Sequence, residues 1–274
     1  MFSKYLPEKI CEKLSDFSLI QEVRIRAGFP VQVIHSFGTN WLSEVVSYVT
    51  VQKIFGAVCS NSVYALKEEI KNGFVTLPGG HRVGVCGRCI CIGGKIETIS
   101  DVTSLNFRVA REFVNCSMPI FKKLSGKLCN LILISPPNCG KTTYLRDLCR
   151  LYSLNGSTVV IVDERGEIAP YAKETSVFSY GKGVDVMQFV PKTEGMMLSL
   201  RTMNPQIIAT DEIGNDDEGK MLSEIARCGV KILTTFHGSS VEDFKKRFNE
   251  WNVFEYAVLL NNAKKTEALI CLNG

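Results

Sequence analysis

The stretch Leu131-Ile-Leu-Ile-Ser-Pro-Pro-Asn-Cys-Gly-Lys-Thr-Thr143 decides the fold of this chain. Its first four residues form a short apolar run, which is typical of a buried strand. That strand must end at Pro136 and Pro137, because proline has no N–H to donate to a neighbouring strand. From Lys141 onward leucines recur at helical spacing, at positions 145, 148 and 151. The stretch therefore predicts a buried strand, a tight loop and a helix that begins near Lys141.

A loop of this composition between a strand and a helix matches the phosphate-binding P-loop, or Walker A motif. Backbone N–H groups and the helix dipole favour an anion at such a helix start. Lys141 would sit between the β- and γ-phosphates of a nucleotide, and the Thr142 hydroxyl would bind Mg²⁺. The expected nucleotide-binding residues are Ser135, Pro136, Pro137, Asn138, Cys139, Gly140, Lys141, Thr142 and Thr143. Ser135 replaces the first glycine of the motif, and a serine can make this turn if its φ stays negative.

The composition is that of a globular protein, with 45% hydrophobic and 22% charged residues among 274. This length holds one large domain or two modest ones. No apolar run approaches the roughly 18 residues that cross a bilayer, and no charged-then-apolar leader opens the chain. We therefore expect a cytoplasmic protein that meets a membrane only through partners. The net charge of +4 does not by itself indicate nucleic acid.

The eleven cysteines are expected to be free thiols, because the cytosol keeps thiols reduced. Cys86, Cys89 and Cys91 invite a metal interpretation. A structural zinc site would need a second Cys or His pair downstream, and none follows at that spacing. We therefore expect these cysteines to belong to a strand with alternating packing.

The first part of the chain reads as an α+β domain over residues 1–112, followed by a linker at 113–127. Alternation of apolar and polar residues predicts its strands, and dense glycine predicts tight hairpin turns. The predicted strands are residues 22–27, 31–34, 95–100 and 104–111, with hairpins in 73–87. The predicted helices are residues 6–14, 50–59 and 63–71.

Residues 128–274 read as a second domain in which strands alternate with helices. Continuous apolar runs are typical of parallel strands covered on both faces. They occur at residues 131–134, 158–162, 207–210 and 231–236, and further strands are expected at 256–260 and 268–272. Helices are expected at residues 194–203, 215–229 and 240–250. This order predicts an α/β fold with a parallel-dominated sheet and right-handed crossovers.

Polar residues collect where these strands end, which is where ligands bind in open α/β sheets. Asp211 and Glu212 follow an apolar strand, the Walker B arrangement. Asp211 would hold Mg²⁺, and Glu212 would polarise the water that attacks the γ-phosphorus. The alternative is an acidic pair that only caps the next helix.

Other candidate catalytic residues lie at neighbouring strand ends. Asp163, Glu164 and Glu167 either orient water or metal or only solvate the sheet edge. His237 is placed to sense the γ-phosphate or to relay to a neighbouring subunit; a histidine that is merely hydrogen-bonded is the alternative. An arginine usually neutralises the transition state of phosphoryl transfer. The candidates are Arg201, Arg82, Arg108 and Arg111, each of which could instead be a solvated surface residue.

The run Leu200-Arg-Thr-Met-Asn-Pro-Gln-Ile-Ile-Ala-Thr-Asp-Glu-Ile-Gly214, followed by Thr234-Thr-Phe-His-Gly238, resembles the type II/type IV secretion ATPase superfamily. In that superfamily the strand before His237 would carry the "His box", and Asp163, Glu164 and Glu167 would occupy the "Asp box". The chain departs from the superfamily at Gly214, where those enzymes have an arginine.

Three longer motifs resemble the stage III sporulation protein AA family of endospore-forming bacteria. They are Gly73-Phe-Val-Thr-Leu-Pro-Gly-Gly-His-Arg-Val-Gly84, Ser104-Leu-Asn-Phe-Arg-Val-Ala-Arg111 and Val162-Asp-Glu-Arg-Gly-Glu-Ile-Ala169. The resemblance covers roughly residue 20 to the C-terminus. It implies a RecA-like ATPase that uses ATP with Mg²⁺ and forms a homo-oligomeric ring, expected to be a hexamer. Its implied partners are the membrane-embedded proteins of the channel between mother cell and forespore.

Two other functions stay open. A nucleic-acid-dependent RecA-like ATPase would use basic residues together with aromatic stacking. Arg82, Arg88, Arg108 and Arg111 supply charge, but no aromatic residues are interleaved with them, so nucleic acid is not the expected partner. A nucleotide-binding scaffold with little hydrolysis is the third possibility, because Ser135 and Gly214 depart from the motifs of active enzymes.

Overall fold

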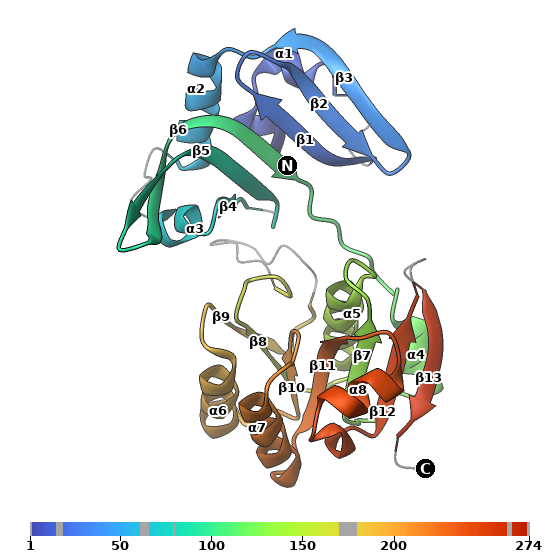
Figure 1. The fold of residues 1–274 in the computed structure, drawn as a ribbon. Coiled ribbons are helices and arrows are strands. Elements are labelled where there is room, and N and C mark those ends of the chain that lie inside the picture. Colours follow the sequence, from blue (N-terminus) through green and yellow to red (C-terminus); the bar gives the residue numbers. More distant parts are fainter. Residues whose placement is uncertain are drawn as a thin grey trace. The chain divides into compact units, whose positions relative to one another are not determined.

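The computed structural model describes residues 2–14, 19–60, 66–78, 80–169, 180–261 and 265–272. These residues divide into two compact units, an N-terminal unit that ends at Arg111 and a C-terminal unit that begins at Glu112 (Figure 1). Residues 113–127, for which a linker was expected, belong to the C-terminal unit and include helix α4 (Met118–Lys123).

The N-terminal unit is built on a six-stranded antiparallel sheet with the order β3-β2-β1-β6-β5-β4. Its strands are β1 (Ile20–Arg26), β2 (Pro30–His35), β3 (Gly38–Val45), β4 (Phe74–Thr76), β5 (Arg82–Ile92) and β6 (Lys95–Arg108). The two strands expected at 95–100 and 104–111 are one continuous strand, β6. The strand bulges where the gap was expected: Cys86 pairs with Ser104 and Arg88 pairs with Ser100, so residues 101–103 of β6 face Gly87 alone. Glycine permits this close approach, because a Cβ at residue 87 would lie 2.5 Å from the Ser100 carbonyl oxygen.

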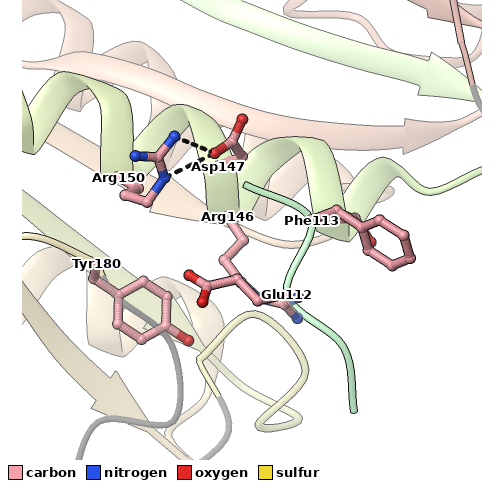
Figure 2. A pocket seen from close by; sticks show the side chains of 7 residues that line it. Glu112, Phe113, Arg146, Asp147, Arg150 and Tyr180 are labelled. Carbon is pink, nitrogen blue, oxygen red and sulfur yellow. Dashed lines mark hydrogen bonds and ion pairs between the residues drawn. The ribbon is translucent and has the colours of Figure 1, made fainter. Parts of the chain in front are cut away.

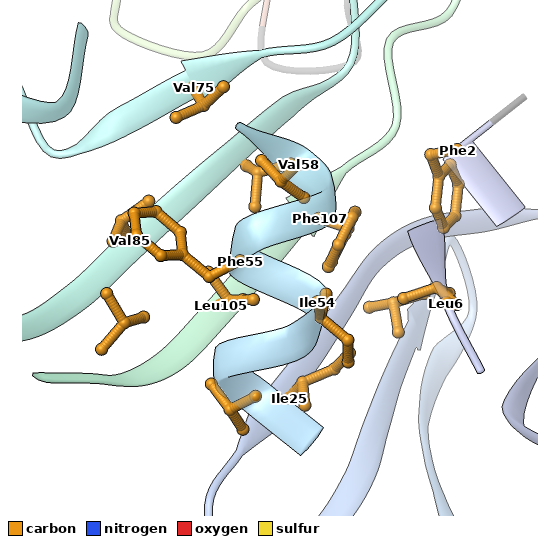
Figure 3. Close-up of a cluster of buried hydrophobic side chains, with 14 of the residues drawn as sticks. Phe2, Leu6, Ile25, Ile54, Phe55, Val58, Val75, Val85, Leu105 and Phe107 are labelled. Atoms are coloured by element: carbon orange, nitrogen blue, oxygen red, sulfur yellow. The ribbon is translucent and has the colours of Figure 1, made fainter. Parts of the chain in front are cut away.

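Short helices cover one face of this sheet and close its core. They are η1 (Phe2–Tyr5), α1 (Glu8–Cys11), α2 (Tyr48–Val58) and α3 (Lys67–Lys71). Helix α2 starts at Ser47, whose side chain accepts a hydrogen bond from the Thr50 N–H. Figure 3 shows Phe55 of α2 among buried side chains of β5 and β6, including Leu105. Of the helix expected at 63–71, residues 63–65 lie outside the described residues.

The C-terminal unit has a seven-stranded sheet with the order β13-β12-β7-β11-β10-β8-β9. Every neighbouring pair is parallel except β12 with β13, which confirms the α/β fold with a parallel-dominated sheet. The strands are β7 (Leu131–Ser135), β8 (Val159–Asp163), β9 (Val184–Gln188), β10 (Ile207–Thr210), β11 (Lys231–His237), β12 (Tyr256–Leu260) and β13 (Thr266–Cys271). Strand β9 was not expected. It lies at the sheet edge, none of its residues is buried, and its sequence is therefore not a continuous apolar run like those of the central strands.

Helices cover both faces of this sheet (Figure 1). Helix α5 (Lys141–Leu154) packs on one face together with α4. The other face carries α6 (Lys192–Thr202), α7 (Asp216–Arg227) and α8 (Val241–Arg247), and the short η3 (Trp251–Val253) follows α8. Buried side chains of α6, α7 and α8 share a core with Ile132 and Ile134 of β7. The expected helix caps at Asn215 and Ser240 are confirmed. Within the described residues, no helix combines the length and the apolar character needed to cross a membrane.

A pH dependence follows from His81 in the N-terminal unit. Its Nδ1 accepts a hydrogen bond from the Ala110 N–H at 3.1 Å, and its ring meets Phe2 edge-on. Burial lowers the pKa of His81 below its usual 6.5, so the folded state favours the neutral ring. The stability that this provides is present above pH 6.5 and is lost as the pH falls below it.

We therefore expect the free energy of unfolding to fall between about pH 7 and about pH 5 more steeply in the wild type than in His81→Gln, because glutamine keeps an acceptor but does not titrate. Urea unfolding at several pH values measures both slopes. Equal slopes would contradict this role of His81.

Candidate functional site

Strand β7 carries the 135–140 loop to the carboxyl edge of the C-terminal sheet. All residues of β7 are buried, and Ser135 is its last residue in extended backbone, so serine is tolerated there. The chain then turns at Asn138 and Gly140, which have φ values of 62° and 90°. Asparagine and glycine adopt this left-handed region most readily. Helix α5 then begins at Lys141, so the expected strand, loop and helix are all present.

The ammonium group of Lys141 is buried and bonds to the loop that precedes it. Nζ donates to the carbonyl oxygens of Ser135 and Pro136, at 2.9 Å each, and lies 3.3 Å from the Ser135 hydroxyl. Burial lowers the pKa of Lys141, and the nearby Glu212 carboxylate opposes that shift. A buried ammonium group needs such partners to offset its lost hydration. The lysine is therefore held at the point where the helix N-terminus attracts anions.

Lys141, His237 and Glu212 form a chain of contacts across three strand ends. Lys141 Nζ lies 3.1 Å from His237 Nδ1, and His237 Nε2 lies 3.0 Å from Glu212 Oε2. His237 is the last residue of β11, and Glu212 follows β10. The His237 ring is therefore the one residue between Lys141 and Glu212, and a movement of Lys141 can displace Glu212 through it.

Asp211 is a buried carboxylate with capacity left for a cation. Its Oδ1 accepts no hydrogen bond among the described residues, and the Lys192 Nζ lies 3.7 Å away. Burial raises the pKa of Asp211 to about 6, although Lys192 opposes this shift. The Asp211 carboxylate and the Thr142 hydroxyl line the same cavity, and together they offer oxygen ligands of the kind that Mg²⁺ prefers. The residues present therefore fit the expected ion.

These groups line one cavity of about 430 Å³ at the sheet edge. That volume is typical of a site for a small-molecule ligand. The lining residues are Pro137, Asn138, Gly140, Lys141, Thr142, Thr143, Arg165, Glu167, Asp211, Glu212, Thr235 and His237. The structure thus brings together most of the candidates from the P-loop, from the Asp211–Glu212 pair and from the end of β11.

Asp163 organises the loop after β8 and is itself buried. Its two oxygens accept the N–H groups of Glu167 and Ala169, each at 2.8 Å. Burial raises the pKa of Asp163, and these backbone hydrogen bonds oppose the shift. The turn directs Arg165 and Glu167 to the cavity, whereas Glu164 is exposed outside the lining residues. Of the acidic candidates in this loop, Glu167 is the one that reaches the cavity.

Arg146 ties this loop to helix α5. Its guanidinium donates to the carbonyl oxygens of Glu167 and Ile168, at 2.8 and 2.5 Å. The Tyr180 hydroxyl donates to the same Ile168 oxygen at 3.1 Å. Figure 2 shows the surrounding pocket, whose cavity of about 10 Å³ has room for little more than one water. The residues drawn there are Glu112, Phe113, Thr143, Arg146, Asp147, Arg150 and Tyr180, and we interpret them as structural.

The arginines proposed for charge neutralisation lie elsewhere. Arg201 is exposed on α6, in a groove that it shares with residues of α7. Arg108 and Arg111 belong to the N-terminal unit. Arg108 Nε lies 3.8 Å from Glu22 Oε1, and Arg111 Nη2 donates to the Ile20 carbonyl oxygen at 2.7 Å. Arg82 of the same unit stacks on the Phe74 ring.

Sequence reasoning missed three charged residues at this site: Lys192, Arg165 and Glu218. Lys192 and Glu218 are buried and in contact at 3.2 Å. The sequence does not reveal that these two residues are buried, because a lysine or a glutamate in the first turn of a helix is usually solvated. The only local signal was the Asn215–Glu218 spacing of a capping box, which the structure contains.

The 164–169 loop gives a test of structure with an adjacent control. In Asp163→Ala the N–H groups of Glu167 and Ala169 lose their acceptor, at a cost of about 1–3 kcal/mol for each. We therefore expect the free energy of unfolding to fall by at least about 2 kcal/mol. In Glu164→Ala it should change by less than about 0.5 kcal/mol, because that side chain is exposed. Equal effects of the two substitutions in urea unfolding would refute this function of Asp163.

Comparisons with known proteins agree with the fold. A family model described as "Sporulation stage III, protein AA" matches residues 2–272. The Stage III sporulation protein AA of Bacillus subtilis (strain 168) is 36% identical over 256 residues, which are 89% of this chain and 83% of that protein.

Among solved structures, the pilus retraction motor PilT with bound ADP has a TM-score of 0.68 at 16% identity, covering 97% of this chain and 83% of PilT. The ATPase DotB of Legionella pneumophila has a TM-score of 0.55 at 14% identity, covering 88% of this chain and 71% of DotB. The fold is therefore that of the RecA-like secretion ATPases. By the match along its length and its identity to the Bacillus relative, the chain belongs to the stage III sporulation protein AA family.

Proposed function

We propose that this chain binds ATP with Mg²⁺ and hydrolyses it to ADP and phosphate. The observation that carries the proposal is the chain of contacts from Lys141 through His237 to Glu212 at the edge of one cavity. A phosphate-binding lysine, a histidine and a carboxylate at three adjacent strand ends form a compact set of groups for phosphoryl transfer, in which positioning and charge neutralisation supply most of the catalysis.

Each residue has a defined task in this proposal. Lys141 exchanges its bonds to the Ser135 and Pro136 carbonyl oxygens for bonds to phosphate oxygens. Thr142 and Asp211 hold Mg²⁺, which neutralises phosphate charge when it is bound. Glu212 accepts a hydrogen bond from the attacking water and orients it. His237 contacts both Lys141 and Glu212, so it links phosphate binding to the orientation of the water.

The charge that develops on the transferred phosphoryl group also needs an arginine. Arg165 lines the cavity and is the candidate within the same C-terminal unit. Arg201, Arg108 and Arg111 are candidates from a neighbouring subunit. An arginine from a neighbouring subunit requires a homo-oligomeric ring, for which we propose a hexamer. Membership of the sporulation family supports a cytoplasmic motor or assembly ATPase that acts on the membrane channel between mother cell and forespore.

ATP turnover by purified wild type, Lys141→Ala and Glu212→Gln tests the catalytic proposal. We expect Lys141→Ala to lose nucleotide binding and turnover. Glu212→Gln should keep ATP affinity but lose about 10²- to 10⁴-fold in turnover, because it lacks the base that orients water. Light scattering with and without ATP and Mg²⁺ reports the subunit number. A wild type that binds ATP as a monomer and turns nothing over would leave a nucleotide-binding scaffold in place of the motor.

One observation favours nucleic-acid dependence as a second candidate. Arg24 and Arg26 of β1 share a sheet face with Trp41 of β3, because Arg24 pairs with Gln32 and Gln32 pairs with Trp41. Trp41 is 57% exposed, and Gln32 of β2 lies between it and Arg24 in the register. An exposed aromatic ring on the same sheet face as arginines can stack a base. This pairing supports a candidate surface that differs from the Arg82, Arg88, Arg108 and Arg111 set considered in the sequence analysis.

This second candidate predicts that single-stranded DNA or RNA stimulates ATP turnover, and that Arg24→Ala with Arg26→Ala abolishes the stimulation. Arg227→Ala is the matched control, because Arg227 is an exposed arginine at the end of α7 in the C-terminal unit. If neither nucleic acid changes the rate at low salt, where phosphate contacts are strongest, this candidate is rejected.

A further inference from the structure

Lys192 is a buried lysine with three oxygen partners next to the Asp211–Glu212 pair. Its Nζ lies 3.2 Å from Glu218 Oε1 and 3.7 Å from Asp211 Oδ1, and it donates to the carbonyl oxygen of Glu212. The residue is 8% exposed at the first position of α6. A buried ammonium group is costly unless it is paired and hydrogen-bonded, so this arrangement needs a structural or functional reason.

The partners of Lys192 fix the backbone that follows β10. The second oxygen of Glu218, Oε2, accepts the N–H groups of Gly214 and Asn215 at 2.7 and 3.3 Å. From the side of β11, the Thr235 carbonyl oxygen accepts the Ile213 N–H at 3.0 Å. The Glu212 carbonyl oxygen, the Ile213 N–H and the Gly214 N–H are therefore all bonded. The Glu212 carboxylate is left to meet His237 in the cavity.

We propose that Lys192 is a positioning residue of the ATPase. Its ammonium group lies between the carboxylates of Asp211 and Glu218 and donates to the Glu212 carbonyl oxygen. This bond holds the Glu212 side chain in the position from which the carboxylate orients the attacking water. This inference rests on the proposed function. Lys192 touches neither nucleotide nor water in this account. It acts through the backbone of Glu212 and through two buried carboxylates, those of Asp211 and Glu218. Its positive charge offsets the free energy that these carboxylates lose when they are removed from water.

Lys192 would be equally buried if it only stabilised the folded state. Loss of activity in Lys192→Met alone therefore does not distinguish a positioning residue from a purely structural one. That substitution leaves the Glu218 carboxylate buried without its cation and destabilises the protein under either explanation. The double variant Lys192→Met/Glu218→Gln removes both charges of the closer pair, at 3.2 Å, and leaves only the more distant Asp211 without this cation. It also keeps an amide oxygen to accept the Gly214 N–H. It should therefore recover most of the lost stability, but it cannot restore the donor to the Glu212 carbonyl oxygen.

The experiment compares wild type, Lys192→Met, Glu218→Gln and the double variant. Lys220→Met is the matched control, because Lys220 is an exposed lysine on α7 that pairs with Asp217 at 3.4 Å. Three quantities are measured for each protein: the urea midpoint without nucleotide, the affinity for a fluorescent ATP analogue, and the single-turnover rate. Lys141→Ala gives the blank for binding and turnover.

We expect the double variant to regain a urea midpoint near that of the wild type and to bind ATP within about threefold of it. Its turnover should remain about 10- to 100-fold lower, because small misplacements of a catalytic group cost rates of that size. Lys220→Met should match the wild type in all three quantities. Recovery of turnover together with stability in the double variant would overturn the inference and leave Lys192 a folding residue. If the wild type itself shows no turnover above Lys141→Ala, the proposed function fails and the inference falls with it.

Discussion

The contact between Lys141 and His237 depends on the register of two parallel strands. β7 and β11 are neighbours, and Ser135 is paired with His237 at their carboxyl ends. Because the loop after Ser135 turns back on itself, the Lys141 ammonium group reaches both the Ser135 carbonyl oxygen and the His237 ring. A shift of one residue in this register would send His237 to the other face of the sheet. The buried core on that face, which includes Phe236, prevents such a shift.

Burial of charge is the second constraint on this site. Asp163, Asp211, Lys141 and Lys192 are all nearly inaccessible to water, and each is held by oriented donors or acceptors or by an opposite charge. Asp163 fixes one loop and Lys192 fixes another, so the cavity lies between two backbone segments that cannot easily move. For the proposed ATP hydrolysis such preorganisation is favourable, because the groups need not reorganise during the reaction. Helix α5 connects the phosphate-binding loop to the 164–169 loop. Lys141 is its first residue, and Arg146 donates to the carbonyl oxygens of Glu167 and Ile168.

The sequence predicted the parts of this molecule that depend on local pattern. Continuous apolar runs identified β7, β8, β10 and β11, and the caps at Asn215 and Ser240 marked their helices. Strand β3 was not predicted, because none of its residues is buried and its sequence lacks a regular alternation of apolar and polar residues. Strand β6 was predicted as two strands, because the close approach at Gly87 is a contact between segments distant in sequence. Most of the candidate residues at the strand ends line one cavity, whereas the contact between Lys192 and Glu218 depends on tertiary packing.

A crystal structure with a non-hydrolysable ATP analogue and Mg²⁺ tests the central claim most directly. We expect the triphosphate to lie in the 135–140 loop and Lys141 Nζ to leave the Ser135 and Pro136 carbonyl oxygens for phosphate oxygens. Thr142 and Asp211 should then face the ion. We also expect Glu212 to stay within reach of His237 and of the γ-phosphate. A nucleotide bound elsewhere, or a Lys141 that keeps its carbonyl partners with the analogue present, would contradict the account.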